Sequence, residues 1–280
     1  MVEAPTISPD EGLSLALERE GFARAEAHGF EVSREELCLL DIDAAHGRRK
    51  VVSYDPRTDR LKGWPGGKAD GSRARAMLSR FSTWAGDLVR ELTPRYASQI
   101  QIGRSSYRPR RIENEPLSWR KDDRRLHLDA FRTRPVGGRR ILRLFANVDA
   151  ERQRVWDLGE DFTHHALRFL PLTQLAPFGV PTLLAAVGIT KAVRTPYDQL
   201  MLQLHDLAKS DDGYQRTSRL RQETFAPGET WLAFTDQIPH AVVAGRMLLE
   251  QTFYLPVGAL HDERRSPLRI LERMTDRPLA

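Results

Sequence analysis

The stretch that decides the fold covers residues 124–148 and reads RRLHLDAFRTRPVGGRRILRLFANV. Its first half contains His127-Leu128-Asp129, a turn follows at residues 135–138, and a second β-like segment covers residues 140–148. Side chains two positions apart in an extended strand point to the same side, so His127 and Asp129 are expected to project together. An imidazole beside a carboxylate supplies two ligands of a metal site.

Short β patterns continue on both sides of this stretch. The sequence predicts strands at residues 36–42, 49–54, 124–131, 140–148, 154–158, 222–225, 230–234, 240–243 and 247–255. Helical spacing of apolar residues predicts helices at residues 10–30 and 71–92, separated by a loop at 55–71, and a helical insertion at about 161–209. This pattern is typical of an α+β fold with a mainly β core, either barrel-like or a jelly roll.

The same pattern divides the chain into three parts. Residues 1–104 are expected to form a helical and mixed N-terminal flank that packs on the core. Residues 105–258 would form the β core, including the insertion at about 161–209. Residues 259–280 form a charged tail, which is expected either to make a short helix or to stay mobile.

Composition narrows the classes of protein. The 280 residues are 40% hydrophobic and 29% charged, as in soluble globular proteins. No apolar run approaches the roughly 20 residues that span a bilayer, and the N-terminus lacks the pattern of a secretory signal. The single cysteine, Cys38, suits a reducing compartment and is expected to pack in the core on the strand at 36–42. These features favour the cytoplasm.

The chain is basic, and arginine provides most of the positive charge. The net charge is +5, and basic clusters recur at residues 104–111, 120–125, 132–143 and 264–273. Such a surface favours an anionic partner, namely nucleic acid, a phosphorylated sugar or a membrane surface. A solvated basic surface without a partner remains the simpler interpretation of any one cluster.

A second histidine is needed to complete a metal site. His240 is the best candidate because it begins a β segment in the second half of the β region. His-x-Asp on an early strand and one histidine on a late strand is the arrangement of the two-histidine, one-carboxylate triad of non-haem iron(II) enzymes. His164 and His165 are adjacent on a helix and point about 100° apart, so they suit one ion poorly. His205 could cap a helix or face a substrate, and a core histidine bonded to an aspartate remains the alternative for the triad.

Several blocks of the sequence resemble the Kdo hydroxylases, iron(II)- and 2-oxoglutarate-dependent dioxygenases that act on 3-deoxy-D-manno-oct-2-ulosonic acid (Kdo) of lipopolysaccharide in Gram-negative bacteria. The blocks lie between residues 118 and 256 and read SWRKDDRRLHLDAF, RPVGGRRILRLFANVD, ITKAVRTPYDQLMLQLHD, YQ at 214–215, and WLAFTDQIPHAVVAGRMLLEQTFYLP. The resemblance implies a double-stranded β-helix core, of the jelly-roll or cupin-like kind. It also implies Fe(II) as metal, 2-oxoglutarate as cosubstrate and O2 as oxidant.

The resemblance further implies a reaction and its catalytic residues. His127, Asp129 and His240 match the iron ligands of the family. The expected reaction couples conversion of 2-oxoglutarate to succinate with hydroxylation of C3 of Kdo in Kdo-lipid A, which gives a Ko-type sugar. Two alternatives remain open: a dioxygenase of this kind with another substrate, and a non-catalytic β-barrel protein that binds anionic ligands.

The cosubstrate anchor departs from the pattern of related dioxygenases, which carry an arginine on the strand after the last histidine. Here that strand reads LEQT at residues 249–252. Arg143 is the preferred replacement, since alternation could aim it into the barrel and a guanidinium binds a carboxylate with two hydrogen bonds. Asn147 and Gln251 would add hydrogen bonds, and Arg246 lies near the hairpin tip. An outward surface arginine, as expected for Arg139 and Arg140, is the alternative for Arg143.

The implied substrate is an anionic, lipid-linked sugar, either Kdo-lipid A or a lipopolysaccharide precursor. Lys191, Arg194 and Tyr197 are predicted to form a lid over the open side of the barrel. Further candidates for substrate binding precede the triad strand, namely Arg108, Arg110 and Arg120.

The pattern of charged and aromatic residues, together with the resemblance, indicates the partner and the location. No nucleic acid is expected, because aromatic and basic residues are not interleaved. The basic surface favours peripheral contact with an anionic membrane at the cytoplasmic face of the inner membrane, although no hydrophobic anchor is evident in the sequence. The sequence leaves the oligomeric state open.

Overall fold

The computed structural model describes residues 12–40, 51–109, 117–177 and 179–280. Its strands are β1 Phe22–Ala25, β2 Val52–Asp55, β3 Arg60–Lys62, β4 Gln101–Arg108, β5 Arg140–Asn147, β6 Arg154–Leu158, β7 Arg221–Phe225, β8 Thr230–Phe234, β9 His240–Ala244 and β10 Leu248–Leu255. Its α-helices are α1 Gly12–Glu20, α2 Leu37–Leu40, α3 Lys68–Leu92, α4 Phe162–Phe169, α5 Val180–Ala186, α6 Pro196–Ser210, α7 Asp212–Thr217 and α8 Pro267–Thr275.

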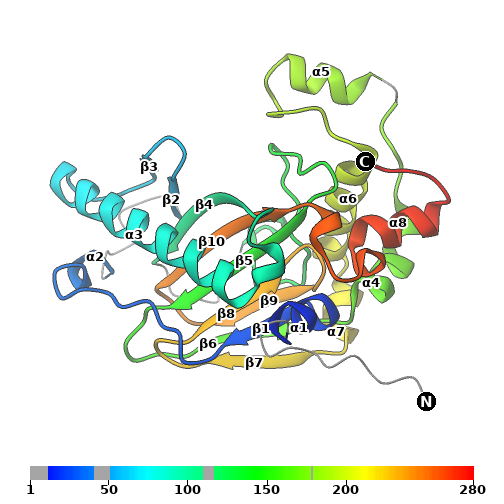
Figure 1. The fold of residues 1–280 in the computed structure, drawn as a ribbon. Helices are drawn as coiled ribbons and strands as arrows, with labels where there is room; N and C mark the ends of the chain where they lie inside the picture. The colour runs from blue at the N-terminus through cyan, green and yellow to red at the C-terminus, as the bar shows by residue number, and fades with distance from the viewer. Residues whose placement is uncertain (1–11, 41–50, 110–116, 178) are drawn as a thin grey trace.

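The strands form two antiparallel sheets (Figure 1). The larger sheet has seven strands in the order β1-β8-β5-β10-β4-β2-β3, and the smaller has the order β7-β6-β9. Aromatic side chains from both sheets pack together between them: the rings of Phe145 and Trp231 stack, and Trp156 meets Phe145 edge to face. The predicted α+β fold with a jelly-roll core is therefore confirmed.

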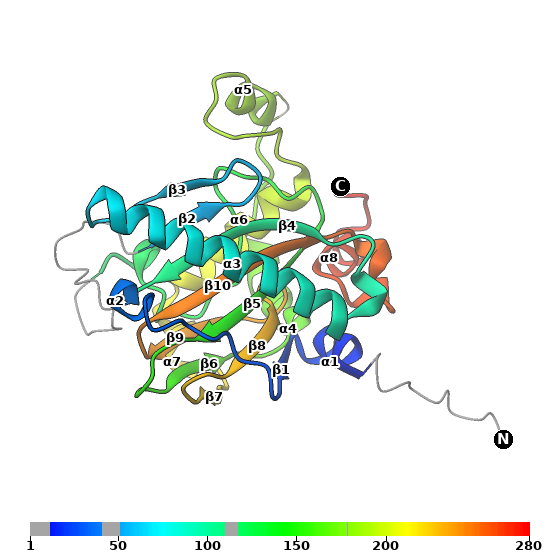
Figure 2. The ribbon, with the colours of Figure 1, turned by 60° about the vertical axis from the view of Figure 1, so that its left-hand side comes forward.

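Helix α3 covers the outer face of the larger sheet (Figure 2). Its apolar side chains recur at helical spacing, which explains why this helix was predictable, and Met77 and Phe81 are fully buried. Strand β5 is buried on both faces. Leu142 and Leu144 belong to the core on the α3 side, whereas Phe145 belongs to the core between the sheets. The predicted alternation along this strand is thus confirmed.

The N-terminal predictions were partly wrong. The helix predicted at 10–30 ends at Glu20, because Gly21 takes a positive φ of 72° and the following residues pair with β8 as an edge strand. The strand predicted at 36–42 is the short helix α2, on which Cys38 is exposed rather than packed in the core. Residues 41 and 42 lie outside the described part of the chain. The predicted loop at 55–71 contains β3, which pairs with β2.

Two further differences concern the strands around the site. The segment 124–131 is no ladder strand, since it makes only an isolated bridge between His127 and His240. Strand β4, in contrast, was not predicted. It pairs with both β10 and β2, so the large sheet continues across the expected domain boundary at residue 104.

The helical insertion lies between β6 and β7, as predicted, and comprises α4 to α7. The C-terminal tail is folded rather than mobile. Leu271 and Leu279 are buried, and the carbonyl of Leu279 accepts a hydrogen bond from the backbone N–H of Tyr197. A search of the described residues finds no helix long and apolar enough to cross a bilayer.

Candidate metal centre

Backbone hydrogen bonds bring together three side chains that are far apart in the sequence. The N–H of His127 donates to the carbonyl of His240 over 3.1 Å, and the N–H of His240 donates to the carbonyl of His127 over 3.0 Å. Two residues further along, the N–H of Asp129 donates to the carbonyl of Thr235 over 2.7 Å. The two segments therefore hold His127, Asp129 and His240 in fixed register.

These three residues offer one ligand atom each, and the three atoms lie within 4.8 Å of one another. The Nδ1 atoms are engaged elsewhere: that of His127 lies 2.7 Å from the carbonyl oxygen of Arg125, and that of His240 lies 3.0 Å from the carbonyl oxygen of Ile238. A carbonyl at Nδ1 fixes the tautomer in which Nε2 carries the lone pair. Each imidazole is therefore prepared to bind a metal through Nε2.

The charges of the site suit a cation. Burial lowers the pKa of His127, and the neighbouring His240 and Lys209 lower it further. Burial likewise lowers the pKa of His240, so both rings are neutral, as metal ligands must be. Burial alone would raise the pKa of Asp129, but the positive charge of Arg143 and the nearby histidines outweigh it, and the net shift is downward. Two neutral imidazoles and one carboxylate fit a non-haem iron site.

Aromatic rings enclose the two histidines. The indole of Trp156 stacks on His240 with ring centroids 5.2 Å apart, and His205 meets His127 edge to face at 5.3 Å. The Nδ1 of His205 lies 2.5 Å from the carbonyl oxygen of Leu128, so this histidine braces the His-x-Asp segment from α6. It is therefore neither a surface residue nor a helix cap.

A chain of charges continues from Asp129 into the space between the sheets. The Nε of Arg143 lies 3.1 Å from Oδ2 of Asp129, and its Nη1 lies 3.5 Å from Oε1 of Glu250. Glu250 also pairs with Arg108, whose Nε lies 2.8 Å from Oε2. Arg143 thus turns inward, as the alternation of β5 predicts, but two carboxylates already share its guanidinium.

Arg154 is a further inward arginine, on β6, that the sequence analysis missed. Its side chain is 2% exposed, and within the described part of the chain its Nε and Nη1 have no hydrogen-bond partner. Burial, followed by the nearby charge of Arg108, lowers its pKa to about 9. Such a guanidinium is a ready site for an anion. Along the strand at residues 154–158, Arg154 alternates with the apolar Trp156 and Leu158, and all three are buried. This alternation was the signal that could have identified Arg154 as an inward residue.

The other residues predicted to bind the cosubstrate have structural partners. The amide nitrogen of Asn147 donates to the carbonyls of Arg152, Phe225 and Ala226. Gln251 lies on the opposite face of β10 from Glu250, where Ser105 donates a hydrogen bond to its side chain. Arg246 pairs with Asp149, with Nε 2.9 Å from Oδ2, in the link between β9 and β10, which belong to different sheets and form no hairpin. The structure therefore brings none of the three beside Arg143.

The residues predicted to bind the substrate are scattered. Tyr197 is 1% exposed and belongs to the core, so it is no lid residue. Lys191 is exposed and Arg194 half-buried, both on the segment that returns from α5. Arg120 is exposed and lies over the ring of Trp119 at 3.9 Å, while Arg108 belongs to the inner chain of charges. Arg110 lies outside the described residues.

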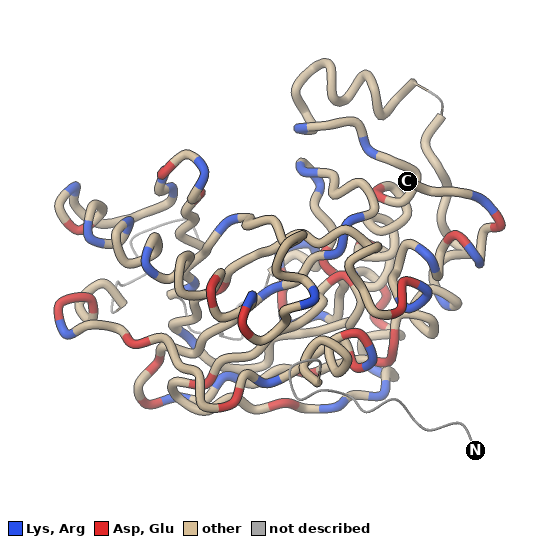
Figure 3. Tube along the Cα trace, in the orientation of Figure 1, with Lys and Arg blue, Asp and Glu red and all other residues tan. Residues whose placement is uncertain are grey.

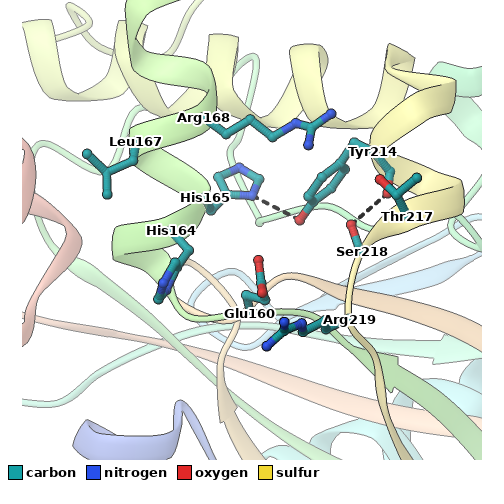
Figure 4. Close-up of a pocket in the computed structure, with 9 residues that line it drawn as sticks. All are labelled: Glu160, His164, His165, Leu167, Arg168, Tyr214, Thr217, Ser218 and Arg219. Atoms are coloured by element: carbon teal, nitrogen blue, oxygen red, sulfur yellow. Dashed lines mark hydrogen bonds between the residues drawn. The ribbon is translucent and has the colours of Figure 1, made fainter.

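A separate cavity of about 440 Å³ lies between α4 and α7 (Figure 4). The two adjacent histidines of α4 diverge there. The exposed His164 pairs with Asp161, whereas the Nδ1 of the buried His165 lies 3.2 Å from the hydroxyl of Tyr214. Burial lowers the pKa of His165 to about 3, so it is neutral. The prediction that this pair would suit one ion poorly agrees with their different partners, and none of the three candidate ligands lines the cavity.

Comparisons with known proteins agree with this arrangement. A family described as 3-deoxy-D-manno-oct-2-ulosonic acid (Kdo) hydroxylase matches residues 4–278. A crystal structure of the Kdo hydroxylase KdoO, a non-haem Fe(II) α-ketoglutarate-dependent dioxygenase, in complex with α-ketoglutarate and Fe(III) is 39% identical, with a TM-score of 0.91 over 97% of this chain and 91% of that chain. Its apo structure is 41% identical, with a TM-score of 0.85 over 90% of this chain and 84% of that chain. A search of curated proteins found no match. The family match and the structural likeness together establish that the chain belongs to the Kdo hydroxylase family.

Proposed function

We propose that this protein is an Fe(II)- and 2-oxoglutarate-dependent dioxygenase that hydroxylates C3 of Kdo in Kdo-lipid A. The observation that carries the proposal is the convergence of the His127, Asp129 and His240 ligand atoms within 4.8 Å, in a chain of the Kdo hydroxylase family. When bound, iron with 2-oxoglutarate and O2 would supply the oxidising power and the oxygen atom. The protein's own part is to hold the metal, orient the cosubstrate and exclude water around them.

The three ligands would hold iron in a site that the protein has arranged beforehand. The carbonyls at Nδ1 fix the orientation of both imidazoles, and Arg143 restrains the carboxylate of Asp129. Since partners of metal ligands set their orientation and basicity, Arg143 acts as a positioning residue for iron.

The distal carboxylate of 2-oxoglutarate would bind Arg154, with Arg108 beside it. Among the described residues, buried Arg154 has two nitrogens, Nε and Nη1, without a hydrogen-bond partner, and no carboxylate forms an ion pair with it. Arg143 also has an Nε without a hydrogen bond, but its guanidinium lies in ion-pair contact with Asp129 and Glu250. An incoming carboxylate would therefore neutralise the buried charge of Arg154. At Arg143 it would have to compete with the existing ion pairs. This assignment replaces the arginine that related enzymes place on the strand after the last histidine.

The substrate would approach from the basic surface outside this cluster. Kdo carries a carboxylate and lipid A carries phosphates, so Lys191, Arg194 and Arg120 suit its charge. Because the substrate is lipid-linked, the enzyme would act at the cytoplasmic face of the inner membrane, with peripheral contact. Nucleic acid is not expected as a partner.

The activity is tested with purified protein, Fe(II), 2-oxoglutarate and Kdo-lipid A. We expect succinate formation that depends on the lipid, and a gain of one oxygen in the lipid by mass spectrometry. His240→Ala should lower the rate by more than about 100-fold, because loss of a ligand exceeds the 10–100-fold effect of losing a ligand's partner. Kdo-lipid A that neither stimulates succinate formation nor gains oxygen would indicate a different substrate, and the absence of stoichiometric iron after anaerobic purification would indicate a binding protein.

The anchor is tested by calorimetric titration of 2-oxoglutarate into Mn(II)-loaded protein, without oxygen. Arg154→Met should weaken cosubstrate binding by about 10–100-fold, which is the loss of one charge-assisted interaction. Arg264→Met is the control, since Arg264 is exposed and pairs with Asp262 in the C-terminal part of the chain, and it should leave the affinity unchanged. A larger loss of affinity in Arg143→Met than in Arg154→Met would reassign the anchor to Arg143.

A further inference from the structure

One segment of the insertion stands away from the rest of the molecule. Residues 173–177 lead out from α4, and residues 179–195 form helix α5 and return to α6; both segments together are here named the α5 arm. Figures 1 and 2 show α5 clear of both sheets from two directions. No side chain of α5 is buried. The arm is therefore not a lid closed over the barrel, as the sequence analysis expected for its returning segment.

The arm exposes a concentration of apolar side chains. In the described part of the chain, ten large hydrophobic residues are exposed, and five of them lie on the arm: Val180, Leu183, Val187, Ile189 and Val193. Leu183 is 62% exposed and Val187 is 59% exposed. Leu172, which immediately precedes the arm, is 64% exposed. Such a concentration of exposed apolar side chains on one segment is typical of an interaction site.

The charge of the arm limits what can cover this surface. Residues 173–195 contain no aspartate or glutamate, and their two charged side chains are Lys191 and Arg194. Figure 3 shows the arm as a tan coil with blue positions only on its returning limb. Apolar side chains at a tip, with cations behind them, are the composition of segments that lie in the interface of an anionic bilayer.

A second copy of the chain fits less well. A two-fold contact between two arms would place the same surface on both sides. It would bring Lys191 and Arg194 of one copy near those of the other, without an acidic side chain of the arm to pair with them. An anionic lipid surface, in contrast, satisfies both the apolar and the basic part of the arm.

The base of the arm is fastened to the segment that carries the metal ligands. The N–H of Lys191 donates to the carbonyl of Thr133 over 2.9 Å, and the guanidinium of Arg194 donates to the carbonyl of Arg132. Both carbonyls belong to the loop that follows Asp129. The arm then continues into α6, whose His205 contacts His127. The position of the arm on a surface would therefore fix the position of the site relative to that surface.

We propose that the α5 arm docks the protein on an anionic lipid bilayer by inserting its apolar side chains between the headgroups, with the exposed Lys191 on lipid phosphates. The inference rests on the proposed function in one respect: docking would place the metal centre close to a lipid-linked sugar substrate. The docking itself follows from the exposed apolar residues, the missing acidic residues and the protruding position of the arm.

The docking is tested by flotation of the protein with vesicles of phosphatidylglycerol and phosphatidylethanolamine, and with vesicles of phosphatidylcholine alone. We expect the wild type to bind the anionic vesicles more strongly. Leu183→Asp/Val187→Asp should lower binding by at least about ten-fold, since each side chain loses its apolar burial. Lys191→Gln should lower binding to anionic vesicles by about five-fold, with little effect on neutral ones.

Leu220→Asp is the matched control, because Leu220 is 48% exposed but lies outside the arm. It should bind vesicles as the wild type does. Thermal unfolding and Mn(II)-dependent binding of 2-oxoglutarate show that each variant is folded with an intact site. The proposal is overturned if the wild type does not bind anionic vesicles, if the arm variant binds them equally well, or if the arm residues instead support a dimer in sedimentation.

Hydroxylation separates this inference from the proposed function. With Kdo-lipid A dispersed in detergent, the arm variant should keep its rate, whereas with the lipid in vesicles the rate should fall with the loss of binding. Failure of the proposed function would appear as vesicle binding by the wild type without hydroxylation in either medium. Failure of the inference would appear as equal hydroxylation by the wild type and the arm variant in vesicles.

Discussion

Arg140 and Arg143 lie three residues apart on β5, and both are buried, but they serve opposite purposes. Arg140 is 0% exposed, with its Nε 2.8 Å from Oδ2 of Asp236 and its Nη2 2.7 Å from the side-chain oxygen of Gln237. Its guanidinium also lies over the ring of Phe234. Buried side chains surround the guanidinium of Arg140, so this arginine forms a closed arrangement that is part of the core. Arg140 was predicted from the sequence to be a surface arginine, and that prediction was wrong.

Arg143 lies on the other face of the same strand, between Asp129 and Glu250 at longer distances of 3.1 and 3.5 Å. One of its two partners is a candidate metal ligand, so its electrostatic contribution acts on a site rather than on the core. The role of a buried arginine thus depends on which residue it is paired with. Burial and residue type alone do not distinguish a structural ion pair from a positioning residue.

The largest effect is expected from Arg140→Met. Removing one partner of a fully buried pair leaves Asp236 without compensation, so the free energy of unfolding should fall by about 3–5 kcal/mol in denaturant titrations. Arg120→Met is the control, since Arg120 is exposed and should change stability by less than about 1 kcal/mol. If Arg140→Met is as stable as the control, the closed arrangement has no structural role.

The second test asks whether Arg140 serves only the core. Replacing both partners, Arg140→Met/Asp236→Leu, removes the uncompensated charge. The double variant should therefore recover at least about half of the stability lost in Arg140→Met. It should also bind Mn(II) with unchanged affinity, because neither residue faces the metal ligands. A loss of Mn(II) affinity in the double variant would contradict the separation between the two faces of β5.

Arg143→Met is expected to act mainly on the site. Asp129 would lose the partner that restrains it, and metal affinity should fall by about 10–100-fold in a competition assay with a fluorescent chelator. In the wild type, Mn(II) at 100 times its dissociation constant should add about 2.7 kcal/mol of stability. That gain should shrink in Arg143→Met at the same Mn(II) concentration and persist in Arg140→Met. Equal gains in the two variants would remove the distinction.

The three candidate ligands and the inward direction of Arg143 could be predicted from the sequence, because both depend on local order. His-x-Asp has a fixed spacing, and alternation along a strand assigns its faces without knowledge of the partners. The placement of the third ligand, His240, also depended on a local signal, the start of a β segment. The role of these residues as ligands remains a prediction that metal analysis of the variants tests.

The sequence could not reveal features that depend on distant partners. Arg140 meets Asp236, which is 96 positions away, and no local pattern indicates that pairing. Asn147 was predicted to contact the cosubstrate because it alternates with Arg143, and Gln251 because it stands on the strand where related enzymes carry the arginine. In the structure, β10 turns Gln251 to the other face and backbone carbonyls engage Asn147. The apolar residues of the α5 arm resembled those of any packed helix. Only the fold shows that nothing in the described chain covers them.

The stacking of Trp156 on His240 gives the protein an optical reporter of its own metal. The ring centroids are 5.2 Å apart, and the indole is 2% exposed, so its emission should be shifted to the blue and sensitive to events at His240. A paramagnetic ion at the triad would quench this emission at such short range, whereas Zn(II) would leave most of it. Tryptophan fluorescence can therefore follow metal loading in real time without a label, and Trp156→Phe would remove that signal while leaving the other four tryptophans in place.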